Sequence, residues 1–335
     1  MPRGRKKKHV EECSLLKALR FIGVAQKALG SPEQTFCRLY ANWAMASNGI
    51  ISAATQIDED LTACPHTTTL IDALEKAQES VNITQLDGLR LSVRAGEFQA
   101  VVPCLEPTPD ALPTVFPDAP IADCDDRLRP ALDIVGKLIS ESGQKIITAA
   151  AQLRNGTVLG TDGNIIIEAW HGIAFPPLML APKAFITALA KIDKPIRRMG
   201  LSETSLTLWF EDNSWMKTQL YPVDTPLPDL YQYLNIPAQP VDVPQELFDV
   251  ARKLAPFSED GVLSLHKGIA RVMSLTRLTD ATEATKSLPE GHCFSIKSLL
   301  AIEPYAKQIH FSAAPGVTLW FGDFVRGAIS DVRVK

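Results

Sequence analysis

The chain has 335 residues, of which 46% are hydrophobic and 21% are charged, and its formal net charge is −4. This composition is typical of a globular protein, and the length allows two or three domains. The acidic balance excludes a protein that is cationic over its whole surface, so any surface that binds nucleic acid must be local. No apolar run reaches membrane-spanning length and the start shows no signal peptide, so we expect a cytoplasmic protein.

The six cysteines are scattered along the chain and form no C-x-x-C pair. None lies at zinc-ligand spacing from a histidine or from another cysteine. The pattern favours reduced thiols in a reducing compartment, and we expect no metal and no other cofactor. The cysteines are Cys13, Cys37, Cys64, Cys104, Cys124 and Cys293.

The run from Arg3 to Lys8 is strongly basic. It is interpreted either as a solvated tail or as a flexible arm that attracts phosphate. Charge alone does not choose between these interpretations, and residues 1–10 are treated as a separate basic tail.

The first segment after the tail alternates helices with hairpins. Leu15, Leu19 and Ile22 recur at helical spacing. Asn48-Gly49 is a hairpin signal, and Pro65 suits the start of a helix. The expected elements are a helix over Leu15–Lys27, strands over Phe36–Ala46 and Ile50–Ile57, a helix over Thr67–Ala77, a hairpin of Gly88–Val93 with Phe98–Val102, and a proline-rich linker over Pro103–Pro120.

The same order of elements then restarts twice. In the second segment we expect a helix over Leu128–Ile139, a hairpin of Ile146–Leu153 with the run from Thr157, a helix over Ala181–Ile192, and a hairpin of Ser205–Phe210 with Trp215–Leu220. In the third segment we expect a helix over Leu247–Leu254, a hairpin of Val262–Leu265 with the run from Ile269, a helix over Ser295–Ile302 and a strand over Val317–Phe321.

Landmarks of these segments recur at a nearly constant spacing. The hairpin glycines Gly49, Gly156 and Gly268 are 107 and 112 positions apart. Pro117 and Pro228, each followed by an aspartate in a linker, are 111 positions apart. A period this long indicates similar domains in tandem, because solenoid repeats are much shorter.

Two strands repeat at the same distance. Leu206–Phe210 and Val317–Phe321 share the pattern T-L-W-F and lie 111 positions apart. The economical interpretation is an α+β protein built of three similar domains, each running helix, strands, helix, strands. The expected domains are residues 11–122, 123–237 and 238–335.

The sequence carries no recognisable catalytic motif. It has no phosphate-binding loop, no dinucleotide fingerprint, no H-E-x-x-H and no G-x-S-x-G. Asp162 is a candidate lone base, but between Thr161 and Gly163 it is better interpreted as a turn residue whose side chain bonds its own backbone. His171 and His292 have no partner at ligand spacing. We therefore do not expect an enzyme.

Several of the expected helices carry basic residues opposite their apolar stripe. In the helix over Ala181–Ile192, the apolar residues fall on one side at 100° per residue, while Lys183 and Lys191 fall on the other. Each such face is either merely solvated or part of a lining that neutralises phosphates without reading bases. The candidates for a DNA-binding lining are Lys17, Arg20, Lys27, His66, Lys76, Arg129, Lys137, Lys183, Lys191, Lys194, Arg252, Lys253 and Lys297.

The middle segment resembles a known family. Gly160–Ile166, followed about fifteen residues later by Ala181-Pro182-Lys183 and a helix, resembles the middle domain of the bacterial sliding clamp, the β subunit of DNA polymerase III. The usual motif of that domain is A-T-D-G-H-R-L. Leu227-Pro228-Asp229 resembles the F-P-D-Y that ends the domain in the family. The resemblance covers the chain from about Cys13 to Lys335, in the family's three-domain order.

The resemblance implies a head-to-tail homodimer whose six domains form a ring around double-stranded DNA. Two helices of each domain would line the hole, and antiparallel sheets would form the outside. The first domain of one chain would meet the third domain of the other, and the assembly closes by two-fold rotation. Such a ring binds DNA without sequence preference and tethers a polymerase, so processivity rises through effective concentration.

Clamps of this family also bind short linear peptides of the DNA polymerase and the clamp loader, in a pocket between the second and third domains. The resemblance places that pocket at Thr161, Gly163, Asn164, Ile165, Ile166, Pro228, Tyr233, Ala328, Ser330 and Val332.

The chain departs from the family at this pocket. The usual His-Arg-Leu is Asn164-Ile165-Ile166, and the usual Met-Pro-Met near the C-terminus is Ser330-Asp331-Val332. We expect the pocket to persist with an altered peptide preference. These departures, the shorter chain and the basic tail favour a clamp of a phage or another mobile element.

One alternative function is kept. A protein with the clamp fold that no longer encircles DNA would act as a decoy or regulator that binds replication factors. Loss of the basic helix faces would leave a decoy active and would weaken the loading or retention of a true clamp, most visibly at raised salt.

Overall fold

The computed structural model describes residues 13–27, 30–77, 81–108, 112, 114–140, 145–223, 226–258, 261–273, 280–311 and 316–332. The basic run from Arg3 to Lys8 lies outside these residues. Within the described parts of the chain, no helix has the length and apolar character needed to cross a membrane. The protein is α+β, and the strand pairs described are antiparallel.

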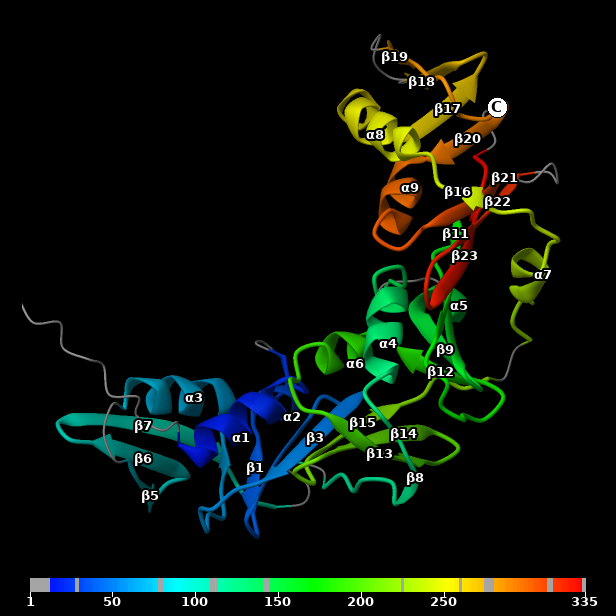
Figure 1. Ribbon diagram of the computed structural model, residues 1–335. Coiled ribbons are helices and arrows are strands. Elements are labelled where there is room, and N and C mark those ends of the chain that lie inside the picture. Colours follow the sequence, from blue (N-terminus) through cyan, green and yellow to red (C-terminus); the bar gives the residue numbers. More distant parts are fainter. Residues whose placement is uncertain are drawn as a thin grey trace, which may run out of the picture. The chain divides into compact units, whose positions relative to one another are not determined.

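The chain divides into two compact units. The first contains residues 1–126 and 184–221, and the second contains residues 127–183 and 222–335. Most elements of both units are labelled in Figure 1. Because the division passes through the expected second domain, residues 123–237, the three-domain organisation stays a prediction.

The first unit contains two antiparallel sheets and their helices. Its helices are α1 (Ser14–Gly23), α2 (Pro32–Thr35), α3 (Thr67–Lys76) and most of α6 (Lys183–Leu189). Its strands are β1 (Arg38–Tyr40), β2 (Trp43–Ser47), β3 (Ile51–Gln56), β4 (Cys64–Pro65), β5 (Asn82–Leu86), β6 (Arg90–Ala95), β7 (Phe98–Leu105), β8 (Pro120–Asp123), β13 (Ile196–Leu201), β14 (Ser205–Phe210) and β15 (Trp215–Gln219).

The larger sheet of the first unit has the strand order β1-β2-β3-β15-β14-β13-β8. Helix α1 packs on one face of this sheet, and the Phe21 ring meets the Phe210 ring of β14 edge to face at 5.6 Å. On β2 the residues alternate, so that Ala44 and Ala46 are buried while Trp43 is half-buried on the other face. Small residues under α1 allow the helix to approach the sheet closely.

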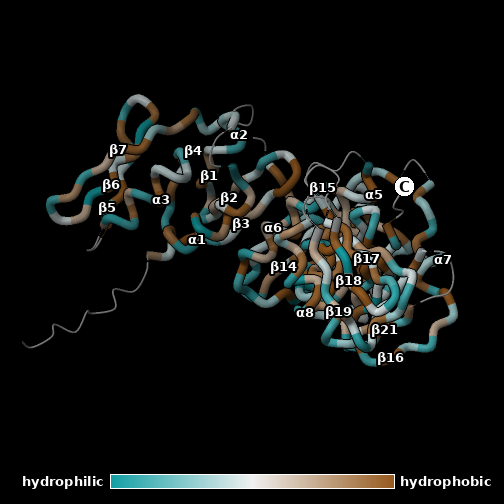
Figure 2. The backbone as a smooth tube through the Cα atoms, turned by 90° about the horizontal axis from the view of Figure 1, so that it is seen from above, coloured by the Kyte–Doolittle hydropathy of each residue, from teal (hydrophilic) through white to brown (hydrophobic). Residues whose placement is uncertain are grey.

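The smaller sheet of the first unit has the strand order β4-β7-β6-β5. Helix α3 contacts both β7 and α1. The N-terminus of α3 is capped by His66, whose Nδ1 accepts a hydrogen bond from the backbone N–H of Thr69 at 3.3 Å. In Figure 2, apolar segments are visible along β6 and β7.

The linker between β7 and β8 is fixed to the sheet by Asp118. The Asp118 carboxylate accepts hydrogen bonds from the hydroxyls of Ser205 and Thr207 and from Lys217 Nζ, the last at 3.1 Å. Lys217 and Asp118 keep only 15% and 10% of their side-chain surface exposed. The linker therefore lies on the face of the larger sheet that is opposite α1.

The second unit has the same kinds of layers. Its helices are α4 (Leu128–Gly136), α5 (Ile146–Ala149), α7 (Tyr231–Leu234), α8 (Gln245–Leu254), the short 3₁₀ helix Ala255–Phe257, and α9 (Ile296–Ile302). Its strands are β9 (Ala150–Arg154), β10 (Thr157–Thr161), β11 (Ile165–Trp170), β12 (Met179–Pro182), β16 (Val241–Asp242), β17 (Val262–His266), β18 (Ile269–Met273), β19 (Asp280–Ala284), β20 (His292–Ser295), β21 (Gln308–Phe311), β22 (Val317–Phe321) and β23 (Val325–Ser330).

The larger sheet of the second unit has the order β12-β9-β10-β11-β23-β22-β21-β16, and the smaller has the order β19-β18-β17-β20. Helix α4 packs on β10 and β11, and helices α8 and α9 pack on each other. The closest approach of α4 is at Gly160, where an added Cβ would lie 2.4 Å from Val135 Cγ1. A glycine is required at that position because the helix leaves no room for a side chain.

Along the described residues, a helix followed by three antiparallel strands recurs with α1, α3, α4, α6, α8 and α9. This order of elements corrects the alignment of the first segment with the other two that the sequence suggested. Gly49 lies between the second and third strands of its segment, whereas Gly156 and Gly268 lie between the first and second. Gly49 therefore corresponds to Gly163, and the turn Ala41–Asn42 corresponds to Gly156. Because this turn adopts positive φ angles of 49° and 61° without a glycine, the sequence shows no signal for it.

Several expected elements differ from the structure. The helix expected over Leu15–Lys27 ends at Gly23, and the helix expected over Leu128–Ile139 ends at Gly136. The strand expected over Phe36–Ala46 is interrupted by the Ala41–Asn42 turn. The first residues of the expected strand Ile146–Leu153 form the helical turn α5. The helix expected over Ala181–Ile192 runs only from Lys183 to Leu189, since Ala181 and Pro182 pair with β9 as part of β12.

Candidate functional site

The turn between β10 and β11 is built by its own side chains. Asp162 Oδ1 accepts hydrogen bonds from the backbone N–H groups of Asn164 and Ile165, both at 2.8 Å. Thr161 Oγ1 accepts from the N–H of Gly163 at 3.0 Å and donates to the Ile165 carbonyl at 2.6 Å. Gly163 has a φ of 98°. The interpretation of Asp162 as a turn residue is confirmed, because both acceptor bonds of its carboxylate are local.

This turn forms one wall of a pocket of about 330 Å³ in the second unit. The other walls come from α5, from the segment before α7, and from β22 and β23. The residues around the pocket are Lys145, Ile147, Thr148, Thr161, Gly163, Asn164, Ile166, Pro228, Leu230, Tyr233, Val317, Ala328 and Ser330. The volume lies in the range of about 300–1,000 Å³ that is typical of ligand sites.

The structure brings together eight of the ten residues expected at this pocket. Ile165 and Val332 lie outside it. Ile165 is 1% exposed, and successive strand residues point to opposite faces, so Ile166 faces the pocket and Ile165 does not. Val332 donates its N–H to the Cys293 carbonyl at 2.7 Å and follows β20 instead.

Several pocket residues were missed by the sequence interpretation: Lys145, Ile147, Thr148, Leu230 and Val317. Ile147 and Thr148 belong to the helical turn that was expected as a strand. Val317 was recognised only as part of a repeated strand. Lys145 and Thr148 are polar, whereas Ile147, Leu230 and Val317 are apolar, so no shared pattern in the sequence marks these five residues.

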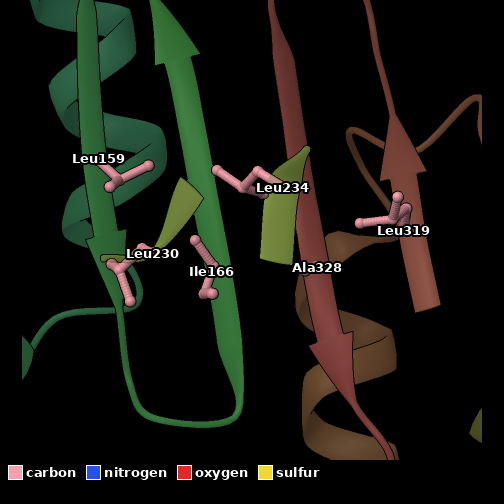
Figure 3. Packing of buried hydrophobic residues seen from close by; sticks show 6 residues of the cluster. All are labelled: Leu159, Ile166, Leu230, Leu234, Leu319 and Ala328. Carbon is pink, nitrogen blue, oxygen red and sulfur yellow. The ribbon is translucent and has the colours of Figure 1, made fainter. Parts of the chain in front are cut away.

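A compact apolar cluster forms the floor below the pocket (Figure 3). Its buried members come from β10, β11, the segment around α7, β22 and β23. They are Leu159, Ile166, Leu230, Leu234, Leu319 and Ala328. Ile166 pairs with Ala328 across the β11–β23 junction, so the pocket depends on strands that are far apart in the sequence.

A buried carboxylate holds the pocket wall in place. Glu168 Oε1 accepts a hydrogen bond from the Tyr231 hydroxyl at 2.8 Å, and its Oε2 accepts one from Arg326 Nε at 2.8 Å. Burial raises the pKa of Tyr231, and its hydrogen bond to Glu168 raises it further. The Tyr231 hydroxyl therefore stays protonated, and α7 is tied to both strands of the junction.

The pocket is apolar apart from its rim. Lys145 is exposed there and has no acidic partner among the described residues. The residues that line the pocket include no acid. The site can take apolar side chains in its floor and a carboxylate near Lys145. Within the parts of the chain that the structure describes, no cluster of His, Cys, Asp or Glu could hold a metal ion.

Many cations expected on the helix faces are engaged with acids. Arg20 pairs with Glu75 at 2.7 Å, and Lys194 pairs with Asp212 at 2.6 Å. Although burial opposes it, the hydrogen bonds from Lys194 and Ser214 hold the pKa of Asp212 below its usual value. Such surface pairs contribute little to stability.

The same holds in the second unit. Lys137 lies 3.2 Å from Asp133 and donates to the Tyr305 hydroxyl at 2.8 Å, a bond that raises the pKa of Lys137. Further pairs are Arg252 with Asp249 and Glu303, and Lys253 with Glu283. Both cations of helix α8, Arg252 and Lys253, are therefore paired with acidic side chains.

Other expected cations are exposed and have no acidic partner among the described residues. They are Lys17, Lys27, Lys76, Lys191 and Lys297. Lys17, Lys76 and Lys297 lie on helices, Lys191 lies two residues after α6, and Lys27 lies four residues after α1. These lysines are the best placed of the expected set to meet phosphates.

Two members of the expected DNA-binding set have structural contacts. Lys183 is half-buried and donates from Nζ to the Ile139 carbonyl at 2.6 Å, just after α4. His66 caps α3 and meets the Phe36 ring edge to face at 5.1 Å. The remaining member, Arg129, is half-buried on α4.

Comparison with known proteins places this geometry in a fold. Neither profiles of protein families nor curated protein sequences match the chain. Solved structures do: the Caulobacter crescentus DNA polymerase III β subunit has a TM-score of 0.79 at 16% identity, covering 97% of this chain and 99% of its own. This chain has the fold of the bacterial sliding clamp.

Two further clamp structures are similar. The Pseudomonas aeruginosa clamp bound to griselimycin has a TM-score of 0.76 at 17% identity, covering 96% of this chain and 97% of its own. The Helicobacter pylori β clamp bound to a DNA ligase peptide has a TM-score of 0.72 at 15% identity, covering 95% and 98%. The clamp fold inferred from Gly160–Ile166 and the linkers is thereby confirmed.

Proposed function

We propose that this chain is a DNA sliding clamp, a processivity factor without a catalytic site of its own that acts in the cytoplasm. It would encircle duplex DNA as a head-to-tail homodimer and tether a replicative DNA polymerase. The observation that carries the proposal is the clamp fold over 97% of the chain. The open sheet edges support the dimer, the exposed lysines support DNA binding, and the pocket supports the capture of peptides.

The strand order supports a dimer. Within the first unit β3 pairs with β15, and within the second β11 pairs with β23. Each is the third strand of a helix-plus-three-strands segment, and so are β7 and β19. Among the described residues, β19 has a partner only in β18, and β7 pairs beyond β6 only at its last two residues.

Open edges of this kind invite pairing with another chain. Val101, in the open part of β7, is 45% exposed. Pairing of β7 with β19 of a second copy would repeat the β3–β15 and β11–β23 junctions. Two such β7–β19 pairings would join two copies about a two-fold axis, which is the commonest closed symmetry of soluble oligomers.

The exposed lysines support DNA binding without sequence preference. Lys17, Lys76, Lys191 and Lys297 are spread over four helical segments, and none has an acidic partner among the described residues. Lysines spread in this way would neutralise phosphates as point charges, and phosphate contacts carry no sequence information. Binding should therefore weaken steeply as salt rises.

The pocket supports the capture of linear peptides from the polymerase and the clamp loader. Its apolar floor and its rim lysine suit a short segment with apolar side chains and a carboxylate. A clamp with this fold, that of Helicobacter pylori, has been solved with a DNA ligase peptide. Asn164 and Ser330, two departures from the family, line the pocket, which supports an altered peptide preference.

The dimer is tested by molar mass in solution. We expect the wild-type protein to have twice the mass of the chain, and Val101→Lys to shift it toward the monomer by placing a charge on the β7 edge. Ile121→Lys is the matched control, because Ile121 is also an exposed strand residue, at 61%. A monomeric wild type, or equal loss with both variants, would contradict the ring.

Encirclement is tested by retention on DNA. Loaded protein should stay on a circular plasmid and be lost once the plasmid is linearised. Changing Lys17, Lys76, Lys191 and Lys297 together to Glu should reduce retention, most at raised salt. The control changes the same amount of charge at Arg90, Arg94, Lys267 and Lys286, which lie outside the helices.

The same experiment separates the clamp from the decoy. A decoy would show equal loss from circular and linear DNA, and the four-lysine variant would retain the activity of the wild type in binding replication factors. That outcome would overturn the proposed function while leaving the fold and the pocket unchanged.

A further inference from the structure

In the second unit, the chain that leaves β23 passes from the larger sheet to the smaller one. The N–H of Ser330 donates to the Asn164 carbonyl at 2.9 Å, in the turn beside the pocket. The N–H of Val332 donates to the Cys293 carbonyl of β20 at 2.7 Å. Between them, the N–H of Asp331 donates to the carbonyl directly before β22, also at 2.7 Å. We call these three residues the bridging segment, because their N–H groups bind three different elements.

The first residue of the bridging segment is part of the pocket wall. Ser330 and Asn164 both line the pocket. The Ser330 hydroxyl donates a second hydrogen bond to the Asn164 carbonyl at 3.2 Å, between residues that are 166 positions apart in the chain. A movement of the bridging segment would therefore separate two residues of the wall.

A histidine–aspartate pair holds the middle of the bridging segment. His292 Nδ1, on β20, lies 3.2 Å from Asp331 Oδ2. An ionised carboxylate only accepts hydrogen bonds, so the histidine is the donor. The side chains of His292 and Asp331 keep only 12% and 18% of their surface exposed. Asp331 Oδ1 is buried and has no hydrogen-bond partner, so among the described side chains His292 alone donates to this carboxylate.

The His292 ring is fixed by the two sheets. It lies parallel to the Phe294 ring, with an interplanar angle of 2° and centroids 5.6 Å apart, and the Phe311 ring of β21 is 5.4 Å away. Phe294 is fully buried, and the backbone of His292 pairs with Leu265 of β17. The donor is thus held by packed elements, whereas its acceptor lies one residue after the end of β23.

The energetics of this pair are asymmetric. Removing one partner of a buried hydrogen bond leaves the other with its full desolvation penalty, whereas replacing both partners by apolar groups can be nearly neutral. Without the His292 donor, the Asp331 carboxylate gains by turning toward water. The bridging segment is held by single hydrogen bonds and opens more easily than β23, which is paired on both sides.

We propose that His292 and Asp331 are positioning residues of the peptide pocket. Their hydrogen bond keeps the bridging segment on β20 and thereby holds Ser330 against Asn164, so that a peptide meets a wall that is already ordered. Ordering the wall in advance raises affinity, because the binding peptide does not have to supply the ordering free energy. Neither His292 nor Asp331 lines the pocket itself. The inference rests on the proposed capture of linear peptides and names the contact that sets the pocket wall.

Another histidine of the second unit provides a matched control. His310 Nδ1 lies 3.2 Å from the Gln239 carbonyl oxygen at an exposed site, and neither residue lines the pocket. Water can replace this hydrogen bond when the histidine is removed, so no buried group is left without a partner. His310→Phe therefore makes the same substitution without the effect expected at His292.

Hydrogen exchange of the full-length protein tests the positioning role without any peptide. His292→Phe keeps a ring beside Phe294 and removes the donor. Exchange of the Ser330 and Val332 amides should rise about tenfold as the bridging segment opens, with the amides of β17 unchanged. His292→Asn, whose amide nitrogen can take the place of Nδ1, should restore exchange close to that of the wild type, and His310→Phe should have no effect.

A double variant separates an orphaned carboxylate from a loss of packing. Asp331→Leu in the His292→Phe background replaces both partners by apolar side chains, so exchange of the bridging segment should return most of the way to the wild-type rate. Exchange in the double variant that is as fast as in His292→Phe, or faster, would overturn the proposal.

The consequence for binding is measured with a peptide selected on the wild-type protein from a displayed library of random short peptides. The peptide is kept only if Tyr233→Ala, in the pocket, abolishes its binding. His292→Phe should weaken this peptide about fivefold, the effect of one orphaned hydrogen-bonding group. His292→Asn and the double variant should bind it nearly as tightly as the wild type.

The outcomes separate this inference from the proposed function. Unchanged exchange in His292→Phe, an equal rise in β17, no rescue by His292→Asn, or peptide binding that is indifferent to His292→Phe would each overturn the positioning role. A library that yields no peptide dependent on Tyr233 would contradict the proposed peptide capture, and with it the role of the pair in binding. The exchange rates would then still show whether the pair holds the bridging segment.

Discussion

Arg326 Nε lies 2.8 Å from the carboxylate of Glu168, whose side chain is 2% exposed. The two residues face each other across the β11–β23 junction, and Tyr231 adds a hydrogen bond from α7. A buried charge of this kind is tolerated only while its partners are present. The contact therefore couples the sheet junction to the wall of the pocket.

We predict that Arg326→Met destabilises the second unit by about 3–5 kcal/mol, because it leaves Glu168 buried without its cation. Tyr231→Phe should cost about 1–2 kcal/mol, the usual range for one buried hydrogen bond. Denaturant unfolding, with hydrogen exchange of β23 as a local probe, measures both. The control is Arg197→Met, whose pair with Glu211 is 3.5 Å long and exposed. A loss as large in the control as in Arg326→Met would contradict the assignment.

Gly163 and Gly23 form a matched pair for a test of backbone strain. Neither would place a new Cβ within 4 Å of another atom, but only Gly163 has a positive φ, of 98°. Gly163→Ala should therefore cost about 1–2 kcal/mol, while Gly23→Ala in α1 should stabilise by up to about 1 kcal/mol. Thermal unfolding of the two variants measures whether each substitution lowers or raises stability. Destabilisation by both substitutions would show that space, and not φ, limits these positions.

Lys183 and Lys191 test the division between structural and exposed cations. Lys183→Met should lower the free energy of unfolding by about 1–3 kcal/mol, because the Ile139 carbonyl loses its donor. Lys191→Met should change it by less than about 0.5 kcal/mol, since Lys191 is exposed. Urea unfolding of both variants provides the measurement. Small and equal effects of both substitutions would contradict a structural role for Lys183.

The buried thiol of Cys37 predicts a loss of stability at high pH. Burial raises the pKa of Cys37 from 9.0 to about 12. Between these values the unfolded chain has lost the thiol proton and the folded chain keeps it, so the free energy of unfolding falls as pH rises. The contribution of this group is about 1.4 kcal/mol per pH unit.

Comparison with Cys37→Ala isolates this effect. The difference in unfolding free energy between wild type and variant should be constant up to about pH 8 and should move in favour of the variant above pH 9. Denaturant titrations at pH 7, 8, 9 and 10 provide the measurement. A difference that does not change with pH would show that the thiolate is accommodated in the folded protein.

The helices and most hairpins could be predicted because their signals are local. The stripe of Leu15, Leu19 and Ile22 lies within one helix, and the Thr161-Asp162-Gly163 turn closes through bonds between residues at most four positions apart. The turn at Ala41–Asn42 was missed because its positive φ angles are carried by residues other than glycine. That single turn shifted the predicted register of the first copy.

The pocket could be predicted in part, through the resemblance to the clamp family. Thr161, Ile166 and Ala328 line the pocket, whereas Ile165 and Val332 lie outside it. A motif reports which segment is present and does not report which face of a strand a side chain takes. That depends on the pairing of β11 with β23, whose partners are about 160 positions apart.

Local chemistry in the chain determined most of the helices and the Asp162 turn, because short-range hydrogen bonds and side-chain periodicity act within a few residues. Tertiary structure decided that Lys183 donates to a backbone carbonyl and that Glu168 pairs with Arg326. Each of these contacts joins segments far apart in the chain. Their formation depends on sheet register and burial, for which the sequence carries no local signal.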